Sequence, residues 1–293
     1  MGLQKEDHPK LDEKRFCIFV PCYLSERFVE DTIDRIPWDS LPDLYYRIVF
    51  VDNASTDRTW EVIEKIVAKL QAAGHDAHGI RNPKNISYGG SNKVILDYCI
   101  ENDLGMIAVL HSDGQYLPEE LPRLITEFVE HPEYTMFYGS RLMGAPLEGG
   151  MPKYKFLANH VLSWLQNTVL GSNLSEFHSG YRFYRVSRLA QLPYHANSDY
   201  FAYDSHIIFQ IIKRGWAIGQ APIPTFYGDE TSYVNPIRTP VGIVTNVLAY
   251  VMHNWGLKKV ARYDIEPASS NSDDGSMEEH DLQRDEARRG VLN

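Results

Sequence analysis

Short runs of apolar residues alternate, along the first half of the chain, with stretches in which apolar residues recur at helical spacing. The continuous apolar runs, typical of strands that are buried on both faces, are residues 15–20 (RFCIFV), 46–51 (YRIVFV) and 106–110 (MIAVL). The helical spacing occurs in residues 28–36, 60–70 and 118–130. Gly74 and Pro118 stand where such helices end and begin. This alternation predicts an α/β fold with a mostly parallel central sheet flanked by helices.

Polar residues follow each of the three apolar runs. They are residues 21–23 (PCY), 52–55 (DNAS) and 111–115 (HSDGQ). In a parallel sheet the carboxyl ends of the strands meet at one edge, and ligands bind in the crevice beyond that edge. Helix capping would account equally well for Ser55 and Asp57, but it does not account for Asp113 and Gln115. The sequence therefore predicts a binding crevice rimmed by these three loops.

One large domain with extensions at both ends accounts for the organisation of the chain. We expect a flexible stretch in residues 1–14, a folded domain in residues 15–235, an amphipathic helix in residues 236–263 and a disordered acidic tail in residues 264–293. The tail holds nine Asp or Glu against three Arg, so it carries −6 of the net charge of −10.

The composition excludes several classes of protein. A hydrophobic fraction of 43% and a charged fraction of 23% fit a globular protein, and no basic stripe suggests nucleic acid as a partner. Cys17, Cys22 and Cys99 show no paired spacing, so we expect no disulfide framework and a reducing, cytoplasmic location. Residues 1–14 lack the apolar core of a signal peptide, and residues 241–255 are too short and too polar to span a bilayer.

Asp113 and its neighbours are the strongest candidate for a metal site. His111 and Gln115 flank Asp113 just beyond a strand, so we expect oxygen and nitrogen donors to lie close together there. Carboxylate and carbonyl oxygens are the ligands that Mg²⁺ and Mn²⁺ favour in proteins. By itself this string is weak evidence, because Asp-Gly is also a common turn.

Seven short motifs follow one another in a characteristic order. They are VPCYLSE (20–26), FVDNASTDRT (50–59), NPKNISYGGSNK (82–93), LHSDGQYLPEEL (110–121), YGSRL (138–142), SGYRFYR (179–185) and APIPTFYGDETS (221–232). This series resembles family 2 glycosyltransferases and is most similar to the dolichyl- and polyprenyl-phosphate sugar synthases. The resemblance implies a GT-A fold over residues 15–235, an inverting sugar transfer, a UDP-, GDP- or dTDP-sugar donor and a polyprenyl phosphate acceptor.

The resemblance also assigns the donor side of the site. Asp113 and Gln115 match the second acidic position and the glutamine of the family's D-x-D-x-Q metal motif, and His111 stands at the first acidic position. A bound Mg²⁺ or Mn²⁺ would stabilise the charge on the departing diphosphate. Ser25 stands where the family usually has Glu, and we expect Glu26 to take over part of that role. The expected contacts with the nucleotide sugar are Pro21, Tyr23, Glu26, Asp52, Asn53, Gly89, Gly90, Ser112 and Asp113.

Physical reasons support some of these donor-side assignments, and others have an alternative. Asp52 matches the aspartate that contacts the nucleoside, and Gly89 and Gly90 are expected to let the backbone approach the donor closely. His111 either ligates the cation or hydrogen-bonds a phosphate or a backbone carbonyl. Asp229 and Glu230 either close over the donor or form a solvated turn.

The acceptor side is assigned in the same way. The expected contacts with the acceptor phosphate are Arg141, Lys155, Asn159 and Arg182. Arg182 could equally hold a loop in place through its fork of donors, and Lys155 could be a surface charge. Asp204 begins a predicted helix, where it is either a catalytic residue or a charge that the helix dipole favours. The expected catalytic residues are Asp113, Asp204 and Arg141.

The chain leaves several functional alternatives open. Residues 240–255, followed by Lys258 and Lys259, predict a helix that either lies at a membrane surface or packs on the body. A transferase that acts on a sugar or protein hydroxyl in cell-surface polysaccharide synthesis would use Asp204 as its base. A catalytically silent protein that binds nucleotide sugars would also fit the replacements at His111 and Ser25.

Overall fold

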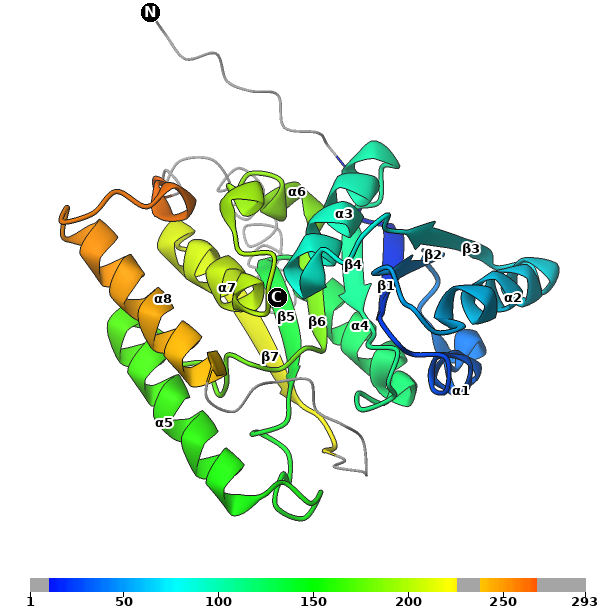
Figure 1. The fold of residues 1–293 in the computed structure, drawn as a ribbon, viewed down its shortest axis with the longest axis horizontal. Coiled ribbons are helices and arrows are strands. Elements are labelled where there is room, and N and C mark those ends of the chain that lie inside the picture. Colours follow the sequence, from blue (N-terminus) through cyan, green and yellow to red (C-terminus); the bar gives the residue numbers. More distant parts are fainter. Residues whose placement is uncertain (1–10, 226–237, 268–293) are drawn as a thin grey trace, which may run out of the picture.

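The computed structural model describes residues 11–225 and 238–267. Its core is one seven-stranded sheet with the order β3-β2-β1-β4-β6-β5-β7 (Figure 1). The strands are β1 (Arg15–Cys22), β2 (Tyr45–Asp52), β3 (Asp76–Arg81), β4 (Met106–Val109), β5 (Tyr134–Ser140), β6 (Arg182–Arg185) and β7 (Ala217–Pro222). The helices are α1 (Val29–Asp34), α2 (Thr59–Ala72), α3 (Ser87–Glu101), α4 (Leu121–Glu130), α5 (Lys153–Leu170), α6 (Val186–Leu189), α7 (Ala202–Arg214) and α8 (Arg238–Asn254). Single 3₁₀ turns occur at Trp38–Ser40, Pro118–Glu120, Tyr194–Ala196 and Ala261–Tyr263.

The sheet is parallel except around one strand. β3, β2, β1 and β4 all pair in parallel, and β5 pairs with β7 in parallel, whereas β6 runs antiparallel to both β4 and β5. The prediction of a mostly parallel sheet is therefore confirmed. The register places Cys22 beside Asp52, so the loops after β1 and β2 leave the sheet at the same edge.

Helices cover both faces of the sheet. Phe16, Ile18 and Val20 of β1 face the core beneath α1, α2 and α4, and the alternate residues Cys17 and Phe19 face the core beneath α3 and α7. These five side chains are fully buried, which is why β1 is a continuous apolar run and not an alternating one. None of the described helices is long and apolar enough to cross a membrane.

Both ends of the folded body differ from the expected boundaries. Leu11 packs against the core and Glu13 forms an ion pair with Arg185, so the stretch expected to be flexible up to residue 14 contacts the body. At the other end Ile265 is buried, so the acidic tail expected from residue 264 starts after that residue. Residues 226–237, which include Asp229 and Glu230, lie outside the described part.

Gly89 and Gly90, near the start of α3, were expected to contact the sugar donor, but they pack against another segment of the chain. A Cβ atom on Gly89 would lie 2.4 Å from the carbonyl oxygen of Ser198, and Gly90 N–H donates to the carbonyl of Asp199 at 3.1 Å. Both glycines are buried. The close approach that they permit is therefore between α3 and the segment that leads into α7, and contact with a donor is not needed to explain them.

His206, in α7, binds the backbone of the segment that leads into α7. Its Nδ1 accepts a hydrogen bond from the Ser198 N–H at 3.1 Å, and the side chain is buried. Burial lowers the pKa of His206 to about 3, and the positive charge of Arg262 acts in the same direction. The imidazole is thus held neutral as a hydrogen-bond acceptor.

We expect Gly89→Ala to lower the free energy of unfolding by about 1–3 kcal/mol, because backbone atoms of Ser198 and Asp199 occupy the space that its methyl group needs. Gly242→Ala in α8 is the matched control, since nothing lies within 4 Å of its added Cβ. That variant should be neutral or up to about 1 kcal/mol more stable. Urea denaturation measures both, and equal stabilities of the two variants would contradict the close packing at Gly89.

Acidification should destabilise the fold partly through His206. Its native pKa of about 3 lies below the ordinary 6.5, so the unfolded chain binds one more proton between these pH values. The stability that neutral His206 contributes is present above pH 6.5 and is lost as the pH falls, with a slope approaching about 1.4 kcal/mol per pH unit. Urea denaturation at several pH values measures this slope. His206→Asn should reduce the slope, whereas His160→Asn, at an exposed position, should leave it unchanged.

Candidate functional site

Hydrogen bonds join the loops that follow β1, β2 and β4. Leu24 N–H donates to the Ser55 hydroxyl at 3.0 Å, and Ser25 N–H donates to the Thr59 hydroxyl at 2.8 Å. The hydroxyls of Ser25 and Ser112 are 2.8 Å apart. The three loops therefore meet at one edge of the sheet, as their positions after parallel strands predicted.

Asp52 and Asn53 shape the loop after β2. Asp52 is fully buried, with one carboxylate oxygen accepting from Ser55 N–H at 3.1 Å and the other 3.3 Å from Arg81 Nε. Asn53 is buried too, and its side-chain oxygen accepts from Ile86 N–H at 2.9 Å. These contacts hold the β2 loop against the start of α3.

In the loop after β1, Ser25 and Glu26 contact different parts of the site. Ser25 is buried and contacts Ser112, next to Asp113. Glu26 accepts the backbone N–H of Arg58 at 2.9 Å and so stabilises the start of α2. Pro21, which was expected in this loop, lies within β1 and is half-buried, and Tyr23 is exposed.

Asp113 offers one carboxylate to a cation. Its Oδ1 accepts Gln115 N–H at 3.1 Å, and its side chain is half-buried at the end of the β4 loop. In residues 11–225 and 238–267 no three His, Cys, Asp or Glu side chains converge as a metal site. Mg²⁺ commonly binds through one or two carboxylates completed by substrate phosphates and water, and Asp113 fits that arrangement.

His111 packs closely against Gly180 in the loop before β6. Its Nε2 is the ring atom nearest to Gly180, where an added Cβ would lie only 2.5 Å away. Burial lowers the pKa of His111, although Asp113 and Asp204 act in the opposite direction. The ring also stacks on Tyr88 with 5.8 Å between centroids. The ring thus packs between α3 and the loop before β6, and its Nε2 has no hydrogen-bond partner among the described residues.

Asp204, in the first turn of α7, belongs to a buried polar cluster with Tyr88, His111 and Arg182. Its Oδ1 lies 3.5 Å from Arg182 Nη1. Burial raises the pKa of Asp204, while Arg182 and His111 oppose the shift. Within the described residues the Tyr88 hydroxyl, His111 Nε2 and Asp204 Oδ1 are buried without a hydrogen-bond partner. Such atoms ordinarily bind water or a polar ligand, so this cluster can receive one.

Arg182 does not face an acceptor, contrary to the expectation that it binds phosphate. Its guanidinium is almost fully buried and donates to the backbone carbonyls of Ser179 at 2.6 Å, Phe177 at 2.9 Å and Asp204 at 3.2 Å. The alternative reading is the correct one. Arg182 fixes the loop before β6 because carbonyl groups of the chain take up its donors.

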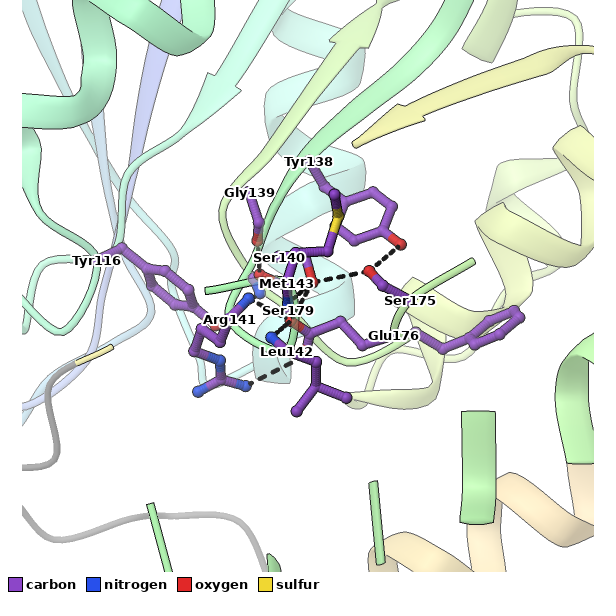
Figure 2. Close-up of polar contacts among 12 residues, drawn as sticks. Tyr116, Tyr138, Gly139, Ser140, Arg141, Leu142, Met143, Ser175, Glu176 and Ser179 are labelled. Atoms are coloured by element: carbon purple, nitrogen blue, oxygen red, sulfur yellow. Dashed lines mark hydrogen bonds and ion pairs between the residues drawn. The ribbon is translucent and has the colours of Figure 1, made fainter. Parts of the chain in front are cut away.

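Arg141 lies on a turn that a buried carboxylate organises. Glu176 is fully buried, and its Oε1 accepts the N–H groups of Arg141 at 2.5 Å and Leu142 at 3.2 Å (Figure 2). The other oxygen of Glu176 is 3.9 Å from Arg141 Nη2. The Arg141 guanidinium also lies over the ring of Tyr116, 5.5 Å from its centroid. Since Tyr116 is three residues from Asp113, Arg141 is linked to the candidate metal loop.

Lys155 and Asn159 lie on a different element. They are half-buried on successive turns of α5, which contacts α7 and α8. The structure therefore places these two residues on one side of α5, while Arg141 follows β5.

Three further residues near the candidate site were not singled out from the sequence, although they lie in or next to its motifs. Tyr88 precedes the Gly89–Gly90 pair, and Glu176 and His178 precede the SGYR motif. Burial, together with Arg182 and Arg141, lowers the pKa of His178 to about 4. Nothing in local spacing marks Glu176, because its partners are 34 and 35 residues away.

Two curated relatives are similar to this chain over most of their length. The undecaprenyl-phosphate mannosyltransferase of Micrococcus luteus is 25% identical over 244 residues, which cover 83% of this chain and 94% of that protein. The polyprenol monophosphomannose synthase of Mycolicibacterium smegmatis is 19% identical over 211 residues, which cover 72% and 77%.

A solved structure shares the fold. Glucosyl-3-phosphoglycerate synthase of Mycobacterium tuberculosis superimposes with a TM-score of 0.55 and 17% identity, over 83% of this chain and 81% of that one. That enzyme has also been crystallised with Mn²⁺, uridine-diphosphate-glucose and phosphoglyceric acid. Residues 17–192 match the sequence profile of Glycosyl transferase family 2. The chain therefore belongs to the family 2 glycosyltransferases and has their GT-A fold.

Proposed function

We propose that this glycosyltransferase transfers a sugar from a nucleotide-sugar donor to a polyprenyl phosphate, with inversion and with the help of Mg²⁺ or Mn²⁺. The observation that carries the proposal is the Arg141–Glu176 turn beside Tyr116. Glu176 holds the backbone of this turn, and the guanidinium lies over the Tyr116 ring and 3.9 Å from the second Glu176 oxygen. A planar fork of donors held in this way suits an anionic phosphate. Two relatives named for transfer to such acceptors support the same assignment.

The chemistry of a phosphate acceptor matches this arrangement. A phosphate arrives already ionised, so it needs positioning more than a base. On the donor side we assign the nucleoside to the loop of Asp52 and the diphosphate to the loop of Asp113. A divalent cation bound there would neutralise the charge that develops on the leaving diphosphate. Arg141 would then direct the acceptor oxygen in line with the departing group.

A hydroxyl acceptor is the second candidate, because Asp204 could serve as its base. The carboxyl is buried with a raised pKa, and its Oδ1 has no hydrogen-bond partner in the described residues. A base of this kind suits the deprotonation of an alcohol. The neighbouring Arg182 ion pair favours a structural role for the same group.

A panel of UDP-, GDP- and dTDP-sugars, with Mg²⁺ or Mn²⁺ and with or without a polyprenyl phosphate, tests the proposal. We expect release of nucleoside diphosphate that depends on the polyprenyl phosphate, with radiolabelled sugar in the lipid extract. Label in a water-soluble product would select the hydroxyl acceptor instead. Asp113→Ala should lower turnover about 100-fold or more, because a metal contact is worth several kcal/mol. Asp43→Ala, which removes an exposed carboxylate 70 residues before Asp113, should leave turnover unchanged.

Arg141→Gln should raise the KM for the polyprenyl phosphate and lower kcat/KM about 10- to 100-fold, as the loss of a charge-assisted pair predicts. Glu176→Gln should act in the same direction but less strongly, because an amide oxygen can still accept the two backbone N–H groups. The affinity for nucleoside diphosphate should stay the same in both. Lys65→Gln on α2 is the control for a lost surface cation, and an unchanged acceptor KM in Arg141→Gln would refute this role.

A further inference from the structure

Helix α5 exposes its apolar side and buries a polar one. The exposed apolar residues are Tyr154 (68%), Leu157 (64%), Val161 (55%) and Trp164 (67%), which recur every three or four residues. On the opposite side the helix buries the polar Ser163 and Gln166, with Leu170 at its end, and the Gln166 amide has no hydrogen-bond partner among the described residues. An ordinary surface helix has the reverse arrangement. This helix is therefore built to meet something apolar outside the body.

Helix α8 is apolar on two sides. Ile243, Val247 and Tyr250 are buried, and the helix packs on α7, which confirms that it is part of the body. A second stripe, again at a spacing of three or four residues, is exposed and consists of Val241, Val244, Leu248 and Met252. Just beyond the helix Trp255 is 74% exposed.

The two exposed stripes belong to neighbouring helices. α5 and α8 contact each other and lie side by side at one end of the molecule, as Figure 1 shows. We call the surface formed by these two stripes the α5–α8 face. Apolar patches that extend over two helices mark interaction surfaces more often than solvated ones.

The charge around this face is opposite to that of the whole chain. Residues 151–175 and 238–263 contain six Lys or Arg and no Asp or Glu, although the net charge of the chain is −10. Lys153, near the start of α5, and Lys258, just after α8, are both exposed. A partner that carries negative charge next to an apolar layer would match both properties.

We propose that the α5–α8 face lies on a membrane that contains anionic lipid. Tyr154, Trp164 and Trp255 are the amphipathic ring types that favour the boundary between headgroups and acyl chains. The aliphatic residues of the two stripes would enter the acyl layer by a few ångström, and the lysines would attract anionic headgroups. This surface includes α5, which the sequence did not single out.

The charge pattern disfavours the other occupants. A second copy of the chain would bring together two faces with an excess of positive charge, although Asp264 pairs with Lys259 at 2.8 Å. Residues 268–293, which hold seven Asp or Glu, have the charge to cover the face, but their large apolar residues are few. A lipid surface supplies both the anions and the apolar layer.

The inference deepens the proposed function, because a polyprenyl phosphate lies in a bilayer, but its test needs no acceptor. Full-length protein is sedimented with vesicles of phosphatidylcholine alone or with an equal amount of phosphatidylglycerol, at low and at high salt. We expect binding to the anionic vesicles that weakens with salt. Trp164→Glu and Leu248→Glu should each reduce binding about tenfold or more, because each removes a buried apolar side chain from the lipid. Phe28→Glu, an exposed apolar residue before α1, should bind like the wild type.

Several outcomes would overturn the membrane surface. They are the absence of binding to anionic vesicles at low salt, equal binding by Trp164→Glu and Phe28→Glu, a solution dimer that Trp164→Glu dissociates, and binding that requires removal of residues 268–293. The assay of nucleoside diphosphate release with detergent-dissolved polyprenyl phosphate is run in parallel. Trp164→Glu should keep this activity, so a failure of lipid binding and a failure of the proposed transfer are observed separately.

Discussion

The buried guanidinium of Arg182 connects the segments on which the site depends. It donates to the carbonyls of Phe177 and Ser179 in the loop before β6 and to that of Asp204 in the first turn of α7. The ion pair with the Asp204 side chain keeps the two buried charges compensated. Since Glu176 directly precedes this loop, the same contacts fix the carboxylate that organises the turn of Arg141. One side chain thus sets the relative positions of β6, α7 and the turn after β5.

The polar interior next to Arg182 is incompletely satisfied. Burial raises the pKa of Asp204 and lowers that of His111, so both groups are shifted toward their neutral forms. His111 Nε2, Asp204 Oδ1 and the Tyr88 hydroxyl have no hydrogen-bond partner in the described residues, although Asp204 Oδ1 is ion-paired with Arg182. Cores rarely leave such groups unpaired unless water or a ligand completes them.

The proposed donor and acceptor contacts follow different strands of the sheet. The parallel strands β2, β1 and β4 end in the loops of Asp52 and Asp113, which we assign to the nucleotide and the diphosphate. Only β6 runs against the other strands, and beyond it β5, which has the same direction as β4, leads into the turn of Arg141 and then into α5. In the proposed assignment, β6 lies between the strands that lead to the donor loops and the strand that leads to Arg141. The α5–α8 face would then lie on the side proposed for the acceptor.

Local pattern was sufficient for three of the seven strands, for the mostly parallel sheet and for the family. The runs that became β1, β2 and β4 are apolar because both of their faces are covered, and the order of motifs after them identified the glycosyltransferase. Only the tertiary structure decided how individual side chains are used. In the folded chain the donors of Arg182 bind backbone carbonyls, and Gly89 packs against Ser198. Glu176 binds a turn 35 residues earlier, and the apolar side of α5 is exposed. Periodicity reveals which side of an element is apolar, whereas the partner of that side depends on contacts between residues far apart in the chain.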